Sequence, residues 1–229
     1  AEAMPLILDG FHNKRVKAEG NYFNFDVTGE WEIFPQPIQQ PHPPFYMGAG
    51  TNDSIAAAAR NGFGLMQSTL PSVHVIGEHI AHYRAHMKEA PAAYQRNPAF
   101  GDVDVARMTF VAPTNAKAKE LSEAGITHHM KSFMAGGSKT GGYLGDISDK
   151  SGDEQFAYDN LMDGTILHGS PDTVLRKIEE FKAVGTTSLM LHYPPYYGHE
   201  ATRDMLRLFA REVLPHVQAM DVPRLTAAE

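Results

Sequence analysis

The sequence predicts an α/β protein in which parallel β-strands alternate with α-helices. Three observations predict this class. Short apolar runs alternate with helical segments from residue 45 onward, helix-capping residues separate them, and the last unit, over 170–213, is complete. Such an alternation forms parallel βαβ units. Because both faces of a parallel sheet must be covered, a (β/α) barrel and an open doubly wound sheet are the two candidate architectures.

The composition limits what the protein can be. The chain has 229 residues, which suits one or two domains, a formal net charge of −7 and no cysteine. Without cysteine there is no disulfide, iron–sulfur cluster, Cys-ligated zinc or Cys nucleophile. The mildly acidic balance argues against nonspecific nucleic-acid binding. No long apolar run and no signal peptide is present, so we expect a cytoplasmic protein that does not cross a membrane.

The first 44 residues predict less regular structure. Residues 1–5 are typical of the end of a helix, and residues 22–34 predict a β-hairpin with strands at 22–27 and 31–34 around a turn at 28–30. A proline-rich stretch at 35–44 follows. Because proline cannot donate to a strand ladder, we expect an extended loop there.

Alternating elements then follow as far as residue 129. We expect strands at 45–49, 63–67 and 105–111, and helices at 52–60, 72–89 and 114–129. Asn61-Gly62 can end the first of these helices and Thr114 can cap the third. The second helix has apolar residues at helical spacing, which are Ile76, Ile80, Tyr83 and Met87.

Residues 135–165 are rich in glycine and predict a long loop, with a short helix near 154–161. Both a lid over a ligand and simple disorder stay open for this loop. Residues 137–140, Gly-Ser-Lys-Thr, resemble the end of a P-loop, but the upstream glycine spacing is wrong and we reject a nucleoside triphosphate site. Beyond the loop, Ser170-Pro171-Asp172 opens a helix that ends at Gly185. A strand at 188–192 and a helix at 200–213 complete the unit.

Histidines recur on one predicted helix face, at positions 79, 82 and 86. Neutral imidazoles at this spacing can collect a metal ion. No H-E-x-x-H motif accompanies them, so a solvated helix flank is the favoured interpretation. The same holds for His128-His129, and we expect no metal site.

The turn at residues 48–54 joins the end of a strand to the start of a helix. Backbone amides are unsatisfied at such a helix start, and the helix dipole attracts an anion there. Glycines let a phosphate approach the backbone closely. From these residues alone, tight packing of Gly48 and Gly50 with Ser54 as a helix cap explains the pattern better than a phosphate site.

Four segments in order nevertheless resemble the bacterial luciferase-like flavin-dependent monooxygenase family. They are Pro35-Gln36-Pro37 through Pro43-Pro44, residues 48–62, residues 169–174 and residues 209–215. The family fold is an eight-stranded TIM barrel, and the resemblance implies that residues 1–229 form the C-terminal portion of one such domain, holding strands five to eight. A complete barrel needs about 250 residues. Half a barrel leaves edges open at strands five and eight, so we expect a homo-oligomer or a completing N-terminal segment.

The resemblance also implies a chemistry. A partner flavin reductase supplies reduced FMN, which reacts with O₂ and oxygenates a small organic substrate. Gly50, Thr51 and Ser54, with Ala49 beside them, then hold the flavin phosphate, and Gln67 and Ser68 line the ring or substrate pocket. No catalytic residue is assigned. An F420-dependent oxidoreductase of the same superfamily and a non-catalytic flavin-binding fragment stay open as alternatives.

The aromatic loop after the last strand lies at the same end of the predicted barrel. Its tyrosines at 193, 196 and 197 could stack on a ring or exclude water, and they could equally be packing that covers the barrel end. His192, which precedes them, could bind flavin or substrate or serve only the structure. The residues alone do not separate these interpretations.

Overall fold

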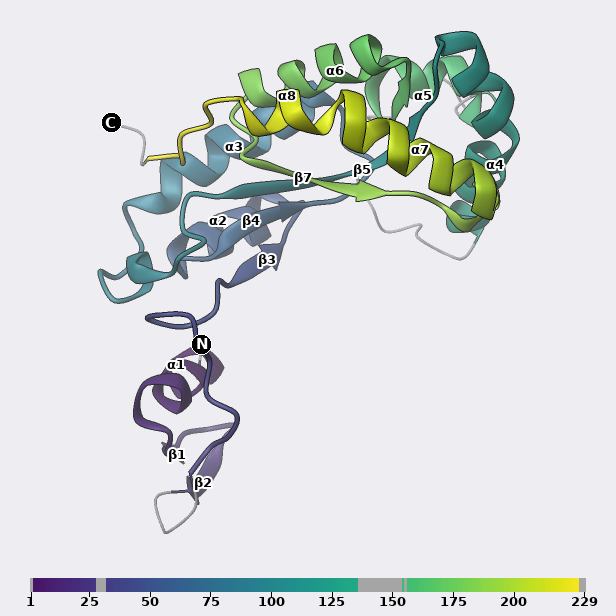
Figure 1. Ribbon diagram of the computed structural model, residues 1–229. Coiled ribbons are helices and arrows are strands. Elements are labelled where there is room, and N and C mark those ends of the chain that lie inside the picture. Colours follow the sequence, from purple (N-terminus) through teal and green to yellow (C-terminus); the bar gives the residue numbers. More distant parts are fainter. Residues whose placement is uncertain (1, 28–31, 136–153, 155, 227–229) are drawn as a thin grey trace.

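The computed structural model describes residues 2–27, 32–135, 154 and 156–226. The larger body is a five-stranded parallel sheet with its helices, and a smaller N-terminal unit lies below it in the view of Figure 1. The strands of the sheet are β3 (Tyr46–Gly48), β4 (Gly64–Gln67), β5 (Val103–Val111), β6 (Leu167–Gly169) and β7 (Ser188–His192).

The long strand β5 organises the sheet. Its first residues pair with β4, in the register Leu65 with Val103, and β3 pairs with the other side of β4. Residues 104–108 of the same strand pair with β7. The short β6 pairs only with the last three residues of β5. Strands β3, β4, β5 and β7 therefore follow one another across the sheet in chain order.

Four of the described helices gather on one face of this sheet. They are α2 (Asn52–Arg60), α3 (Val73–Met87), α6 (Pro171–Ala183) and α7 (His199–Glu212). Strands added in one direction through right-handed crossovers place all their helices on the same side. Helix α2 packs against α3, α3 against α6 and α6 against α7, and Figure 1 shows α3, α6 and α7 along one side of the sheet. The arrangement is that of a partial (β/α) barrel, and a doubly wound sheet is ruled out for the described strands.

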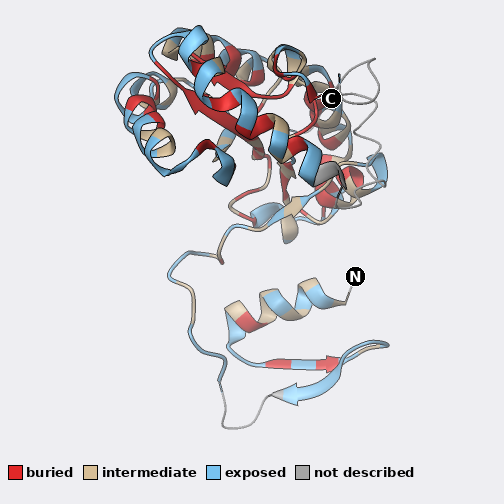
Figure 2. Ribbon diagram, turned by 90° about the vertical axis from the view of Figure 1, so that its right-hand side faces the viewer, coloured by how far each residue is buried: buried red, intermediate tan, exposed pale blue. Residues whose placement is uncertain are grey.

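The two faces of the sheet are buried to different extents. Cross-strand partners in a parallel sheet share a face, so Leu65, Val103 and Val105 lie together on the helix side, where all three are fully buried. Their chain neighbours Met66 and Asp104 point the other way and are only partly buried. Figure 2 shows buried residues gathered in the sheet and in the adjoining helix faces, whereas the N-terminal unit is mostly exposed or intermediate.

Most predicted elements of the larger body are confirmed. Helix α2 has the predicted bounds, and α3 and α6 start directly after their capping residues Ser72 and Ser170. The residues predicted to face the core of α3 are buried, as are Val174, Ile178 and Phe181 of α6. These helices were predictable because local capping and apolar spacing agree with the packing.

Other bounds differ from the prediction. Helix α4 (Asn115–Ala135) continues six residues beyond 129, and α5 (Tyr158–Gly164) starts later than expected. Strand β6, helix α8 (Leu214–Gln218) and the short 3₁₀ helices η1 (Tyr94–Arg96) and η4 (Pro195–Tyr197) were not predicted, since three to five residues carry little periodic signal. The glycine-rich segment, including the P-loop-like residues 137–140, lies outside the described residues from 136 to 153.

The predicted hairpin at 22–34 is wrong. Strand β2 (Asn24–Val27) pairs with the preceding strand β1 (Val16–Glu19), and residues 32–34 form no strand. A tight turn at Gly20 closes this hairpin, with the amide of Gly20 donating to the carbonyl of Phe23. Residues 16–19 alternate buried and exposed positions, which is the pattern of a half-buried strand. Helix α1 (Ala3–Asn13) precedes it and continues through the residues predicted to end a helix.

Candidate functional site

The carboxyl ends of β3, β4 and β7 meet at one edge of the sheet. Loops at this edge carry the ligand site in parallel α/β folds, because several strands deliver side chains there together. The predicted site residues follow β3 or β4, except Gln67, which is the last residue of β4, so the structure brings them to this one edge. The geometry of each then decides what it can bind.

Thr51 and Ser54 form a capping box at the start of α2. The Ser54 amide donates to the Thr51 side chain at 3.3 Å, and the Ser54 hydroxyl accepts from the amides of Gly50 at 3.2 Å and of Thr51 at 3.0 Å. Two of the amides predicted to hold a phosphate therefore already have a partner. A phosphate would gain them only by taking the place of the Ser54 hydroxyl.

Other groups of the same turn remain suited to an anion. The amides of Asn52 and Asp53 are the first two of the helix and have no carbonyl partner within it, and the positive end of the helix dipole lies beside them. A Cβ built on Gly48 would meet no atom within 4 Å, so the approach over this residue is open. The turn thus fits a phosphate that binds the helix start, with the Thr51 and Ser54 hydroxyls beside it.

Gln67 is buried and bonded within the protein. Its side chain is 1% exposed, its amide nitrogen donates to the carbonyl of Ala49 at 2.7 Å, and its amide oxygen lies 2.7 Å from His79 Nδ1. Because an amide oxygen only accepts, His79 donates at Nδ1. Gln67 therefore ties the ends of β3 and β4 to α3. Ser68, by contrast, is exposed at the edge, where a ligand can reach it.

A buried arginine supports this edge from the helix side. Arg107 of β5 is fully buried and donates to the carbonyls of Ser68 at 2.7 Å and Pro71, with its guanidinium 4.4 Å from the centre of the Phe181 ring. Burial lowers the pKa of Arg107 to about 9, so it is still charged at pH 7. Its Nε is buried without a hydrogen-bond partner. Arg107 is the one charged residue in the apolar run 105–111, and this pattern in the sequence indicates a buried cation.

A second buried polar group fastens the loop after β7. His168 of β6 is fully buried, with Nδ1 2.9 Å from the Ser122 hydroxyl and Nε2 2.8 Å from the Tyr197 hydroxyl. Ser122 donates its one proton to the carbonyl of Ala118, so it accepts from Nδ1–H, and Tyr197 donates to Nε2. Burial lowers the pKa of His168 to about 3 and keeps it neutral. The network joins α4, β6 and η4, and no motif or spacing in the sequence predicts it.

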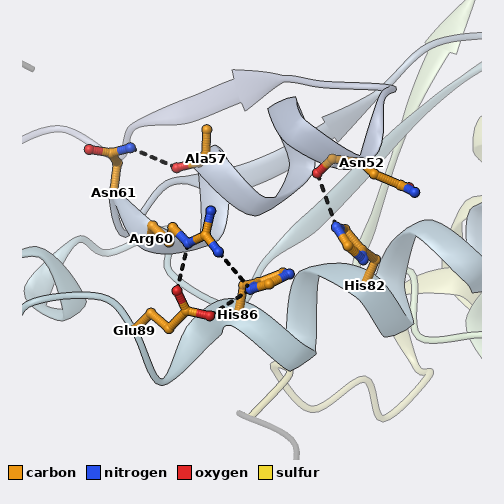
Figure 3. A network of polar contacts seen from close by, with 7 residues as sticks. All are labelled: Asn52, Ala57, Arg60, Asn61, His82, His86 and Glu89. Carbon is orange, nitrogen blue, oxygen red and sulfur yellow. Dashed lines mark hydrogen bonds and ion pairs between the residues drawn. The ribbon is translucent and has the colours of Figure 1, made fainter.

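The three histidines of α3 have separate partners. His79 contacts Gln67, His82 donates to the carbonyl of Asn52 at 3.0 Å, and His86 lies 2.6 Å from Glu89. Figure 3 shows that Glu89 also binds Arg60, so that this cluster ties α3 to α2. Hydrogen bonds from Arg60 and His86 lower the pKa of Glu89 to about 2. The imidazoles thus serve the packing of two helices.

Aromatic and imidazole rings crowd the end of β7. The ring of His192 lies 5.6 Å from that of His129 of α4, and Tyr196 lies 4.5 Å from His128. Tyr193 and Tyr196 are about half exposed. Tyr197 is buried, and its hydroxyl is hydrogen-bonded to His168. The predicted aromatic loop therefore has one anchoring tyrosine and two that face outward at the carboxyl edge.

A sequence model of one family, described as luciferase-like monooxygenase, matches residues 1–188. The chain belongs to the luciferase-like monooxygenase family. The predicted resemblance is thereby confirmed, and with it the partial TIM-barrel-like fold. None of the helices that the structure describes combines the length and the apolar composition needed to span a bilayer.

Three solved structures show the same fold at low sequence identity. The oxygenating constituent of 3,6-diketocamphane monooxygenase from Pseudomonas putida, solved with FMN, is 19% identical over 98% of this chain, with a TM-score of 0.71. The monooxygenase RslO1 from Streptomyces bottropensis is 21% identical over 92% of this chain, with a TM-score of 0.65. The F420-dependent tetrahydromethanopterin reductase from Methanopyrus kandleri is 20% identical over 92%, with a TM-score of 0.55. The chain spans 63%, 58% and 60% of these proteins, respectively.

Proposed function

We propose that this chain is part of a flavin-dependent monooxygenase that uses reduced FMN and O₂ on a small organic substrate. A partner flavin reductase would supply the reduced cofactor, and the protein would act in the cytoplasm. A second copy or a further segment of chain would cover the open face of the sheet. The observation that carries the proposal is the start of α2, which lies with free helix amides at the carboxyl edge of a parallel sheet.

The chain's own residues would bind and orient the cofactor. The amides of Asn52 and Asp53 and the hydroxyls of Thr51 and Ser54 would hold the phosphate, with Ala49 and Gly50 allowing close approach. Gln67 would act indirectly, by fixing the carbonyl of Ala49, and Ser68 would face the ligand. When bound, the reduced flavin supplies the electrons and the reaction with O₂. Tyr193 and Tyr196 would exclude water from the site.

Two alternatives belong to the same proposal. F420 could take the place of FMN, since the fold is shared with an F420-dependent reductase and with an F420-dependent secondary alcohol dehydrogenase solved with an F420-acetone adduct. A non-catalytic flavin-binding role is the other alternative, because this chain spans only about three fifths of the relatives it matches. For the isolated 229-residue chain we expect weak flavin binding and no turnover.

Phosphate recognition can be tested by comparing FMN with riboflavin, which lacks the phosphate. We expect the chain to quench FMN fluorescence with an affinity roughly tenfold higher than for riboflavin, as one or two charge-assisted hydrogen bonds provide. Thr51→Ala, which removes the N-cap of α2 and a hydroxyl beside the proposed phosphate, should weaken this preference. Ser170→Ala, which removes the corresponding N-cap of α6, is the matched control and should keep it. Both variants lose a helix cap, so a similar fall in Tm shows that they are comparable.

Equal affinity for FMN and riboflavin in the unmodified chain would contradict the proposed phosphate site. A parallel titration with F420 decides between the two cofactors. Tighter binding of F420 than of FMN would favour the oxidoreductase alternative.

A further inference from the structure

Four rings from three elements meet at the end of β7, and we refer to them as the His–Tyr cluster. His128 and His129 come from α4, His192 is the last residue of β7, and Tyr196 lies in η4. The rings of His129 and His192 are almost perpendicular, at 85°, and their centres are 5.6 Å apart. The ring of Tyr196 lies 4.5 Å from that of His128 and 6.0 Å from that of His129.

His192 lies on the same face of the sheet as Met190, beside the buried Met108 of β5. Pairing places Ala106 beside Met190 and Met108 beside His192, and alternate residues of a strand share a face. Met190, two residues earlier on this face, is 46% exposed, and His192 itself is partly exposed. Within the described residues His192 makes no hydrogen bond to another protein group, so its ring nitrogens remain for a ligand.

The surroundings of His192 select for a neutral, largely apolar ligand. Burial, together with the neighbouring His192 and His128, lowers the pKa of His129 and so disfavours a positive charge on this ring. Met190, Tyr193 and Tyr196 are 44–48% exposed and offer uncharged contact surface. A carboxylate would find no fixed cation among these residues, in a chain whose net charge is already −7.

We propose that His192 donates a hydrogen bond to the oxygen of a neutral ketone or alcohol whose hydrocarbon part packs on Met190, Tyr193 and Tyr196. This inference rests on the proposed function and names the substrate class of that site. The end of β7 and the start of α2 lie toward the same edge of the sheet, and three strand spacings together with a register offset of four residues separate them by on the order of 20 Å. One extended cofactor and a substrate can therefore share the edge.

The test follows the histidine rings of the 229-residue chain by NMR, after ¹³C-labelling of histidine and assignment with His192→Gln and His129→Gln. Cyclohexanone, cyclohexanol and cyclohexanecarboxylate are the probes, each titrated with FMN present. We expect the ketone and the alcohol to shift the His192 resonance and the carboxylate to leave it unchanged. His192→Phe should weaken cyclohexanone binding roughly tenfold, the loss of one hydrogen bond, whereas the exposed-residue control His216→Gln should not.

The outcomes separate this inference from the proposed function. An unmoved His192 resonance, or an equal response to the carboxylate, overturns the inference, and normal quenching of FMN in the same sample leaves the proposed function standing. Absence of FMN quenching with a clear response to cyclohexanone overturns the cofactor proposal and supports the ketone site. The titration of the unmodified chain decides the matter even where His192→Phe fails to fold.

Discussion

The two faces of the sheet differ in how far they bury neighbouring residues of the same strands. On the helix side, Val103, Val105 and Arg107 of β5 are fully buried. On the other side, Asp104 and Ala106 are partly exposed and Met190 of the neighbouring strand is 46% exposed, and burial resumes only at Met108. One face even buries a guanidinium, whereas the other leaves a methionine open to solvent.

This difference separates stability from function in the molecule. Apolar burial on the helix side supplies the folding free energy, because α2, α3, α6 and α7 remove that face from water. The open face carries His192 and Met190, and it is the face on which we propose that a ligand binds. A sheet face with exposed large apolar side chains is also typical of an interaction surface.

The strongest test of the comparison places one charge on each face. Val105→Asp buries a carboxylate among apolar side chains and should cost more than about 4 kcal/mol in the free energy of unfolding. Met190→Asp exposes the same group to water and should cost about 1 kcal/mol or less, mainly from the poor fit of aspartate to a strand. Urea unfolding followed by circular dichroism measures both.

Equal losses in the free energy of unfolding of the two variants would show that the face that carries Met190 is covered in solution. Unfolding of the parent chain at several protein concentrations then identifies what covers it. A midpoint that rises with concentration indicates a second copy.

The sequence was informative where local signals agree with the packing. The capping residues Ser72 and Ser170 predicted the starts of α3 and α6, and the apolar run 188–192 predicted β7. The hairpin at the N-terminus was misplaced because two neighbouring segments both alternate, and the turn at Gly20 decides which of them pairs. Strand β6 is too short for any pattern, and its pairing with the end of β5 is a tertiary fact.

The site was predictable in position more than in detail. The edge that gathers Gly50, Thr51, Ser54 and Ser68 follows from the order of strands and helices. The capping box of Ser54 and the bridge made by Gln67 depend on distances across the turn, which no spacing in the sequence encodes. The same holds for His168, whose partners Ser122 and Tyr197 are 46 and 29 residues away.

The burial of His168 makes the free energy of unfolding depend on pH. Its pKa in the folded chain is about 3, below the ordinary value of 6.5, because burial disfavours the charged ring. Between these pH values the unfolded chain binds more protons, so the free energy of unfolding falls as the pH falls from 6.5. The loss should reach about 1.4 kcal/mol per pH unit. His168→Gln should show a shallower decline over this range, measured by urea unfolding at pH 7, 6, 5 and 4.

The exposed-residue variant His216→Gln is the control for this experiment and should keep the slope of the parent chain. Identical slopes in the parent and in His168→Gln would mean that water reaches the buried ring. A shallower slope in His168→Gln would show that the loss of stability at acidic pH comes from the network that anchors η4.

The smallest expected effect concerns the contact between α2 and α3 at the outer surface. Glu89 binds Arg60 at 2.6 Å and His86 at 2.6 Å, and Glu89→Gln should lower the Tm slightly at pH 7. Because these hydrogen bonds hold the pKa of Glu89 near 2, below its ordinary 4.5, the contribution is present at neutral pH and is lost as the pH falls from 4.5 towards 2. The groups are exposed, so about 1 M NaCl should remove most of the difference. Glu78→Gln, which breaks a pair within α3 alone, is the matched control, and an equal effect there would show that the Glu89 cluster adds nothing to the packing of the two helices.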